Sequence, residues 1–129
     1  MDLSIVIVSW NVADLLFNCL ESVFAHPPSS EFEVWVVDNA SNDGTVKCVR
    51  EKYPQVKLIA NQENVGFAAA NNQAITQSQS KYVLMLNPDT IVHEETLQLL
   101  IDFLNTTPQA VAAGSMLLSP DGSLQRSCM

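Results

Sequence analysis

The chain has 129 residues, of which 47 % are hydrophobic and 16 % are charged, and this composition predicts one folded domain rather than a disordered chain. Fourteen acidic residues against six basic ones give a net charge of −8, which argues against a nucleic-acid-binding protein because such proteins neutralise phosphates with clustered Lys and Arg. The three cysteines show no CxxC spacing, so we expect neither a disulfide framework nor a zinc site, and a reducing compartment is favoured.

Apolar, β-branched runs alternate along the chain with helical patterns. The runs that predict strands are, in order, Leu3–Val8, Phe32–Val37, Val56–Ala60, Tyr82–Leu86 and Ala110–Leu118. The first is nearly continuous in apolar character, as expected for a strand buried on both faces. No run is long enough to span a bilayer, and we expect no signal peptide.

Four segments between these runs predict helices. They are marked, in order, by an apolar stripe at Leu16, Cys19, Leu20, Val23 and Phe24, by Val46, Val49 and Tyr53, by the alanine-rich stretch Phe67–Ile75, and by a stripe at Leu97, Leu100, Ile101 and Leu104. We expect Asp43 to be the N-cap of the second helix, and Glu94 and Glu95 to lie in the first turn of the fourth. The alternation predicts a mostly parallel sheet with helices on both faces.

Polar residues follow four of the expected strands, in the segments 9–11, 38–41, 61–66 and 87–89. In parallel sheets, ligands bind beyond the carboxyl ends of the strands, so these segments predict a binding site. A polar turn accounts well for Asp43–Thr45. It accounts less well for Asp38, which closes its strand, and we favour a role for this carboxylate in binding a base or a ribose hydroxyl.

Asn87-Pro88-Asp89 has two interpretations of equal weight. It is either a proline-directed turn before a helix, or it provides oxygen ligands for Mg²⁺ or Mn²⁺. An acidic protein needs a cation to bind a diphosphate, and Lys47 is the one basic residue close after a strand end. The sequence contains no GxGxxG after the first strand, no GxxxxGK[ST] and no GxSxG, which argues against a dinucleotide dehydrogenase, a P-loop NTPase and an α/β-hydrolase.

Four motifs together resemble a known family. They are residues 5–11 (IVIVSWN), 36–45 (VVDNASNDGT), 64–72 (NVGFAAANN) and 84–90 (LMLNPDT). In this order they resemble the N-terminal half of a family 2 glycosyltransferase with the GT-A fold, most of all the rhamnosyltransferase-type branch that builds bacterial surface polysaccharides. The resemblance implies a Rossmann-like α/β sandwich, truncated after about the fifth strand, with residues 1–129 as a single nucleotide-sugar-binding domain.

The resemblance also implies roles for individual residues. Those expected around the base, ribose and phosphates of the donor are Ser9, Asn11, Asp38, Asn39, Asn64, Gly66 and Asn71. Which of Asp38 and Asn39 touches the base stays open. Asp89 would bind a divalent metal, Mn or Mg, and Asn87 stands where the family has the first acid of Asp-x-Asp. We expect Asp38 and Asp89 to come from neighbouring strands and to face one crevice.

The implied reaction is inverting transfer from a UDP- or dTDP-sugar to the hydroxyl of a saccharide or lipid-linked saccharide acceptor. No residue matches the family's acidic motif for the general base, so we expect a fragment that binds a nucleotide without catalysing transfer and that self-associates through exposed apolar surface. We expect a cytoplasmic protein, with contact at the inner face of the membrane left open. The alternatives are a non-catalytic nucleotide- or partner-binding module and a sugar-nucleotide pyrophosphorylase-like domain.

Overall fold

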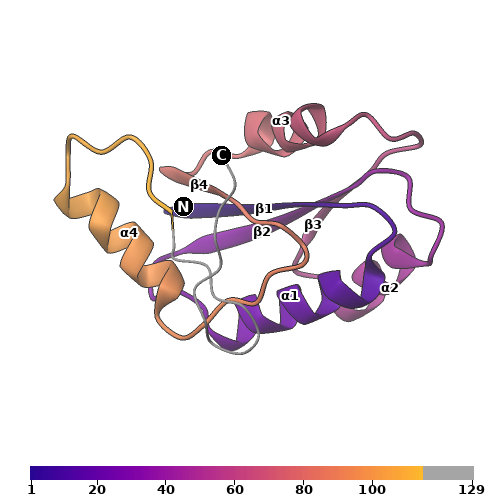
Figure 1. Ribbon diagram of the computed structural model, residues 1–129, viewed down its shortest axis with the longest axis horizontal. Helices are drawn as coiled ribbons and strands as arrows, with labels where there is room; N and C mark the ends of the chain where they lie inside the picture. Colours follow the sequence, from indigo (N-terminus) through magenta and orange to yellow (C-terminus); the bar gives the residue numbers. More distant parts are fainter. Residues whose placement is uncertain (115–129) are drawn as a thin grey trace.

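A four-stranded parallel sheet forms the centre of the computed structural model, which describes residues 1–114 (Figure 1). The strands are β1 (Leu3–Ser9), β2 (Phe32–Asp38), β3 (Lys57–Ala60) and β4 (Tyr82–Met85), and they lie in the order β3-β2-β1-β4. All three pairings are parallel. The expected parallel α/β architecture is therefore confirmed, with β1 and β2 in the middle of the sheet.

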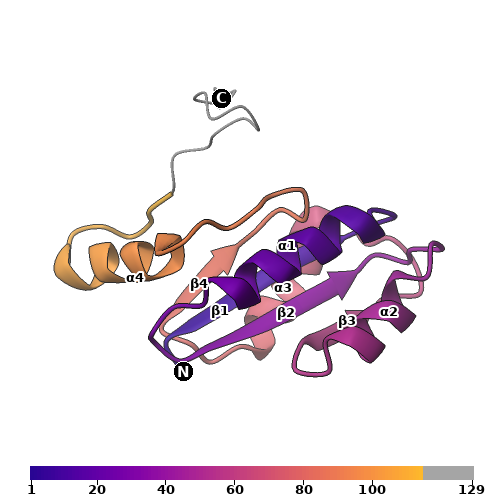
Figure 2. The same ribbon diagram turned by 90° about the horizontal axis from the view of Figure 1, so that it is seen from below.

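Helices cover both faces of this sheet. They are α1 (Ala13–Ala25), α2 (Thr45–Lys52), α3 (Phe67–Gln77) and α4 (Thr96–Thr106). Helix α3 lies alone on one face, whereas α1, α2 and α4 lie on the other (Figures 1 and 2). The arrangement is the one that the alternation of strand and helix predicts.

Alternate residues of each central strand face opposite layers. On β1, Ile5 and Ile7 pack with Leu16 and Leu20 of α1, and on β2 Val34 and Val36 join the same cluster. On the other face, Val6, Trp35 and Val37 pack against α3 through Ala70 and Ala74. The period of two means that Ser9 and Asp38, at the ends of these strands, share the face that carries α1.

Two helix starts differ from expectation. The N-cap of α2 is Gly44, with a φ of 82°, rather than Asp43. Asp43 instead accepts hydrogen bonds from the Thr45 N–H at 3.2 Å and, across thirty positions of sequence, from the Ala13 N–H at 3.1 Å. Glu95 is the N-cap of α4, with a φ of 65°, so Glu94 and Glu95 precede the first turn.

The expected fifth strand is not formed over residues 110–114, where the chain is irregular and Val111 is fully exposed. Residues 115–118 of that expectation lie outside the described residues. Within residues 1–114, β4 is an edge strand.

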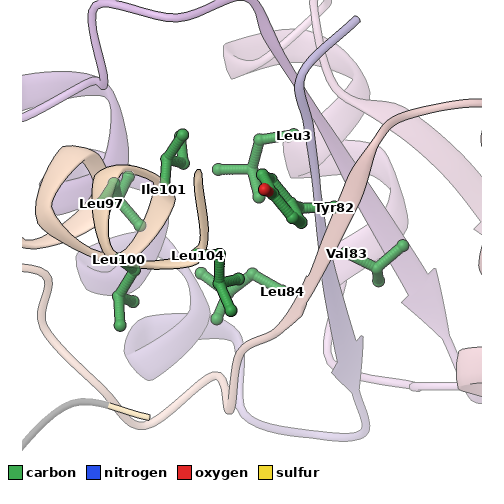
Figure 3. A pocket seen from close by; sticks show the side chains of 8 residues that line it. All are labelled: Leu3, Tyr82, Val83, Leu84, Leu97, Leu100, Ile101 and Leu104. Carbon is green, nitrogen blue, oxygen red and sulfur yellow. The ribbon is translucent and has the colours of Figure 1, made fainter. Parts of the chain in front are cut away.

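A cavity of about 40 Å³ lies between β4 and α4 (Figure 3). It is lined by Leu3, Tyr82, Val83, Leu84, Leu97, Leu100, Ile101 and Leu104. This lining is apolar, and the Tyr82 hydroxyl already bonds Asn105 Oδ1 at 2.7 Å, so the cavity does not suit a diphosphate.

Candidate functional site

Ser9 and Asp38 end the two central strands side by side. They are paired in register across β1 and β2, and their exposed fractions are 0 % and 1 %. Asp38 Oδ2 accepts the Ser41 N–H at 2.9 Å. Neither Asp38 Oδ1 nor Ser9 Oγ has a hydrogen-bond partner in the described part of the chain. A buried polar atom without a partner costs free energy, so this pair keeps hydrogen-bonding capacity that residues 1–114 do not use.

Asn11 ties together the two loops that adjoin this pair. Its N–H donates to Ser41 Oγ at 2.8 Å, and its Oδ1 accepts the Asn42 N–H at 2.9 Å. Asn11 and Ala40 both have positive φ, at 52° and 66°. Asn11 also lines an open hollow of about 380 Å³ at the start of α1, together with Val12, Ala13, Asp14, Leu15 and Asp43. Asp38 lines neither this hollow nor the cavity under α4.

Asn39 anchors the loop that leads into α3. It is buried, and its N–H donates to the Ser9 carbonyl at 2.8 Å. Its side-chain amide donates to the Gly66 carbonyl at 3.2 Å, and its Oδ1 accepts from Asn61 Nδ2 at 3.1 Å and from the Val65 N–H at 3.3 Å. The Asn39 side chain is therefore occupied by the protein itself, whereas Asp38 retains an unpartnered oxygen.

The remaining residues expected near the donor lie along the start of α3. Asn64 is exposed, and its Oδ1 accepts the Gly66 N–H at 2.8 Å. Gly66 is the N-cap of α3, with a φ of 88° and a ψ of 170° that favour glycine. Asn71 is buried one turn into the helix and donates to the Phe67 carbonyl at 3.1 Å. The structure thus brings Asn64 and Gly66 next to Asn39 and places Asn71 further along α3.

The Asn87–Asp89 turn follows the edge strand. The Leu86 N–H still donates to the Val6 carbonyl at 2.9 Å, and beyond it the chain leaves the sheet. Because β1 lies between β2 and β4, the expectation that Asp38 and Asp89 come from neighbouring strands is wrong. Both nevertheless belong to the α1 face. Burial raises the pKa of the Cys19 thiol on α1 to about 11, and the Asp89 carboxylate contributes to this rise.

The oxygens of this turn suit a hard cation in their chemistry. Asn87 and Asp89 are both exposed, and amide and carboxylate oxygens are ligands that Mg²⁺ and Mn²⁺ accept. Residues 1–114 hold no group of three or more His, Cys, Asp or Glu side chains arranged to bind a metal. A cation here would therefore need phosphate oxygens and water to complete its ligand set.

The fold and the polar strand ends define a GT-A-type α/β domain of the kind found in sugar transferases. The model of Glycosyl transferase family 2 matches residues 4–127, and the chain belongs to this family. Glycosyltransferase AglE from Haloferax volcanii is 30 % identical over 117 residues, which are 88 % of this chain and 38 % of that protein. N-acetylglucosaminyl-diphospho-decaprenol L-rhamnosyltransferase from Mycobacterium tuberculosis is 30 % identical over 70 % of this chain and 33 % of its own length. The chain thus spans between a third and two fifths of the length of these relatives.

Solved structures show the same architecture. The crystal structure of Staphylococcus aureus TarS 1-349 in complex with UDP-GlcNAc has a TM-score of 0.73 and 30 % identity, covering 81 % of this chain and 31 % of that one. The mannosyltransferase PcManGT from Pyrobaculum calidifontis, in complex with GDP-Man and Mn²⁺, has a TM-score of 0.76 and 26 % identity over 92 % of this chain and 36 % of that one. None of the helices in residues 1–114 is both long and apolar enough to cross a membrane.

Proposed function

We propose that this chain binds the nucleotide-diphosphate part of a UDP- or dTDP-sugar at the carboxyl ends of β1, β2 and β4. The bound donor would serve an inverting glycosyltransferase of bacterial surface polysaccharide synthesis. Membership of Glycosyl transferase family 2 supports this proposal, as do the complexes of similar folds with UDP-GlcNAc and with GDP-Man and Mn²⁺.

The observation that carries the proposal is that Asp38 Oδ1 and Ser9 Oγ have no hydrogen-bond partner within residues 1–114. A uracil or thymine base offers one ring N–H, and a hydrogen bond to a charged acceptor contributes about 1.5–3 kcal/mol. Asp38, rather than Asn39, is the proposed base contact because the polar atoms of the Asn39 side chain are already bonded. Asp38 is 1 % exposed, so binding requires the turns at Asn11 and Ser41 to move apart.

The proposed cation ligands are Asp89 and Asn87, with Mn²⁺ or Mg²⁺ as the ion. A cation bound at this turn would stabilise the negative charge that develops on the leaving diphosphate. The exposed carboxylate and amide oxygens would hold the ion from one side. Phosphate oxygens of the donor would complete the ligand set, which is the usual way in which Mg²⁺ binds to a site with few carboxylates.

In inverting transfer, the acceptor hydroxyl attacks the anomeric carbon from the face opposite the diphosphate, and a general base takes its proton. We assign no residue of this chain to that base, and we propose that residues 1–129 bind the donor without transferring its sugar. The acceptor would be a saccharide or a lipid-linked saccharide. The name of the mycobacterial relative specifies a diphospho-decaprenol compound, which supports a lipid-linked acceptor. We propose a cytoplasmic location, with contact at the inner face of the membrane.

Self-association is proposed through the edge strand. Val83 and Met85 on β4 are 39 % and 60 % exposed, and an apolar edge strand is a template for pairing with another chain. Sedimentation velocity of the chain over a tenfold concentration range tests this. A Met85→Lys variant should stay monomeric at concentrations where the unaltered chain dimerises.

Calorimetric titration of UDP and dTDP, with Mn²⁺ and with EDTA, tests the donor proposal. We expect binding of at least one nucleotide and tighter binding with Mn²⁺. Asp38→Asn should weaken binding about tenfold or more, in line with a lost charge-assisted hydrogen bond. Asp102→Asn, which alters an exposed carboxylate on α4, is the matched control. If a folded chain binds neither nucleotide under either condition, the proposal is wrong; if Mn²⁺ has no effect, the non-catalytic binding module is favoured.

A further inference from the structure

Ser22 is a buried hydroxyl on α1 that uses both its donor and its acceptor. It is 9 % exposed. Its Oγ donates to the Cys19 carbonyl at 2.7 Å and accepts the N–H of Val92 at 2.9 Å. Val92 is itself 6 % exposed and lies seventy positions further along the chain. This bond therefore joins α1 to the segment that begins with the Asn87–Asp89 turn.

The other end of that segment also meets α1. The Asn87 carbonyl accepts the Thr90 hydroxyl at 2.7 Å, which closes the turn. Cys19 Sγ lies 3.8 Å from the Asn87 carbonyl oxygen and 3.9 Å from Thr90 Oγ1. Thiols are weak hydrogen-bond donors and acceptors, so the bond from Val92 to Ser22 is the stronger of the two attachments. Cys19 and Ser22 are three residues apart and lie on one face of the helix.

No strand holds this segment in place. The backbone bonds from the chain after β4 to β1 end with Leu86. Within residues 1–114, the hydrogen bonds that join residues 87–92 to another element come from Cys19 and Ser22. Helix α1 begins at Ala13, close after Ser9 and Asn11. One rigid element therefore connects the buried strand ends with the Asn87–Asp89 turn.

We propose that Ser22 is a positioning residue, which fixes the Asn87–Asp89 turn relative to the ends of β1 and β2. This inference rests on the proposed function, because it concerns the cation ligands of that site. Ser22 contacts neither the cation nor the nucleotide. It acts through the backbone N–H of Val92, three residues after Asp89. Direct hydrogen-bond partners of metal ligands commonly change metal affinity by about 10- to 100-fold, so we expect an effect at the lower end of this range.

The test is the gain in UDP affinity that Mn²⁺ produces, measured by calorimetry for the full chain and for Ser22→Ala. We expect the variant to lose about tenfold of this gain while its affinity in EDTA is unchanged, since the base contacts stay in place. Ser22→Thr keeps the hydroxyl and should keep the gain. Thr106→Ala is the matched control, because it removes another helix hydroxyl that bonds a backbone carbonyl, at 2.8 Å on α4, without touching residues 87–92.

A full Mn²⁺ gain in Ser22→Ala would overturn the inference, as would an equal loss in Thr106→Ala. A wild-type chain that binds UDP without any Mn²⁺ gain would instead overturn the cation part of the proposed function, and this inference with it. If Ser22→Ala does not fold, Ser22→Cys fills the position with a slightly larger group and replaces a strong acceptor by a weak one. Ser22→Cys should then lose a smaller part of the increase in UDP affinity that Mn²⁺ produces. If the full increase remains, the inference is again wrong.

Discussion

The ends of β1 and β2 and the turn after β4 lie at the same edge of the sheet, but they are held in different ways. Asp38 and Asn39 are buried at the carboxyl end of the central strand β2, and their bonds reach β1, Ser41 and the start of α3. Asn87 and Asp89 are exposed and depend on contacts with one helix. A buried, multiply bonded region must open before a ligand can reach it, whereas an exposed turn is accessible from the start.

The first way to break this comparison is to remove one amide from each region. Asn39→Ala should destabilise the chain by about 3 kcal/mol, because the Gly66 carbonyl and the Val65 N–H lose their partner in a largely buried place. Asn87→Ala should change stability by less than about 0.5 kcal/mol, since that side chain is exposed. Urea denaturation followed by circular dichroism measures both. Equal changes in the free energy of unfolding for the two substitutions would contradict the difference between the buried strand ends and the exposed turn.

The second prediction uses the buried thiol beneath the turn. Burial raises the pKa of Cys19 to about 11 from an ordinary value of 9.0, so between these values the unfolded chain loses this proton first. The free energy of unfolding therefore keeps its full value below pH 9. It falls by up to about 2–3 kcal/mol as the pH rises toward 11. Chemical denaturation from pH 8 to 11 should show this decline. A Cys19→Ser variant should show a smaller slope, and an identical slope would exclude the thiol as its cause.

A third prediction concerns the backbone at the start of α3. Gly66 has a φ of 88° and free space where a Cβ would stand, so Gly66→Ala should cost about 1–2 kcal/mol through backbone strain rather than through a clash. Gly114→Ala also meets no atom within 4 Å, and Gly114 lacks a positive φ. Thermal unfolding should therefore show a lower Tm for the first variant and little change for the second. A similar Tm for both would count against strain at Gly66.

The smallest expected effect is that of Asp89→Ala on stability. The carboxylate is exposed, and its removal should change the free energy of unfolding by less than about 0.5 kcal/mol. The same variant should lose the gain in UDP affinity that Mn²⁺ produces. Calorimetry with Mn²⁺ and with EDTA, run beside urea denaturation, separates the two readouts. An unchanged gain would show that Asp89 is a turn residue.

The order of strands and helices through α4 could be predicted because hydrophobic period is a local property of the sequence. The start of α2 was predicted one residue early. Asp43 has the residue type of an N-cap, but its side chain also bonds Ala13, thirty positions away. The start of α4 was missed because Glu95 adopts a left-handed conformation, which is unusual for glutamate. The strand expected over residues 110–118 does not form over residues 110–114, because strand pairing depends on non-local contacts that the apolar pattern does not contain.

In the candidate site too, local features could be predicted from the sequence, whereas contacts between distant residues could not. The position of Asp38 at a strand end favoured a functional role, and its unpartnered oxygen supports that role. The hydrogen bonds that the Asn39 side chain makes within the protein were not predictable, because its partners Asn61, Val65 and Gly66 are 22 to 27 residues away. Ser41 lies in the segment 38–41 that was expected at the site, but its hydrogen bond with Asn11 was not predicted, and Ser22 was not singled out. For a serine in a helix, such as Ser22, the neighbouring sequence does not indicate that the hydroxyl will bond a backbone group of another element.

The strands of the sheet stop at different heights. The Leu86 N–H makes the last bond of its strand, to the Val6 carbonyl. Because Met85 is paired with Val6, Leu86 lies level with Ile7, and β1 continues for two more residues to Ser9. At a rise of about 3.3 Å per residue, this offset amounts to roughly 7 Å along the strand axis. A molecule that touches both levels must carry a spacer of comparable length between its hydrogen-bonding ring and its anionic group. If the donor binds as proposed, this step favours compounds in which a sugar ring separates the base from the diphosphate over free pyrophosphate and bare nucleobases.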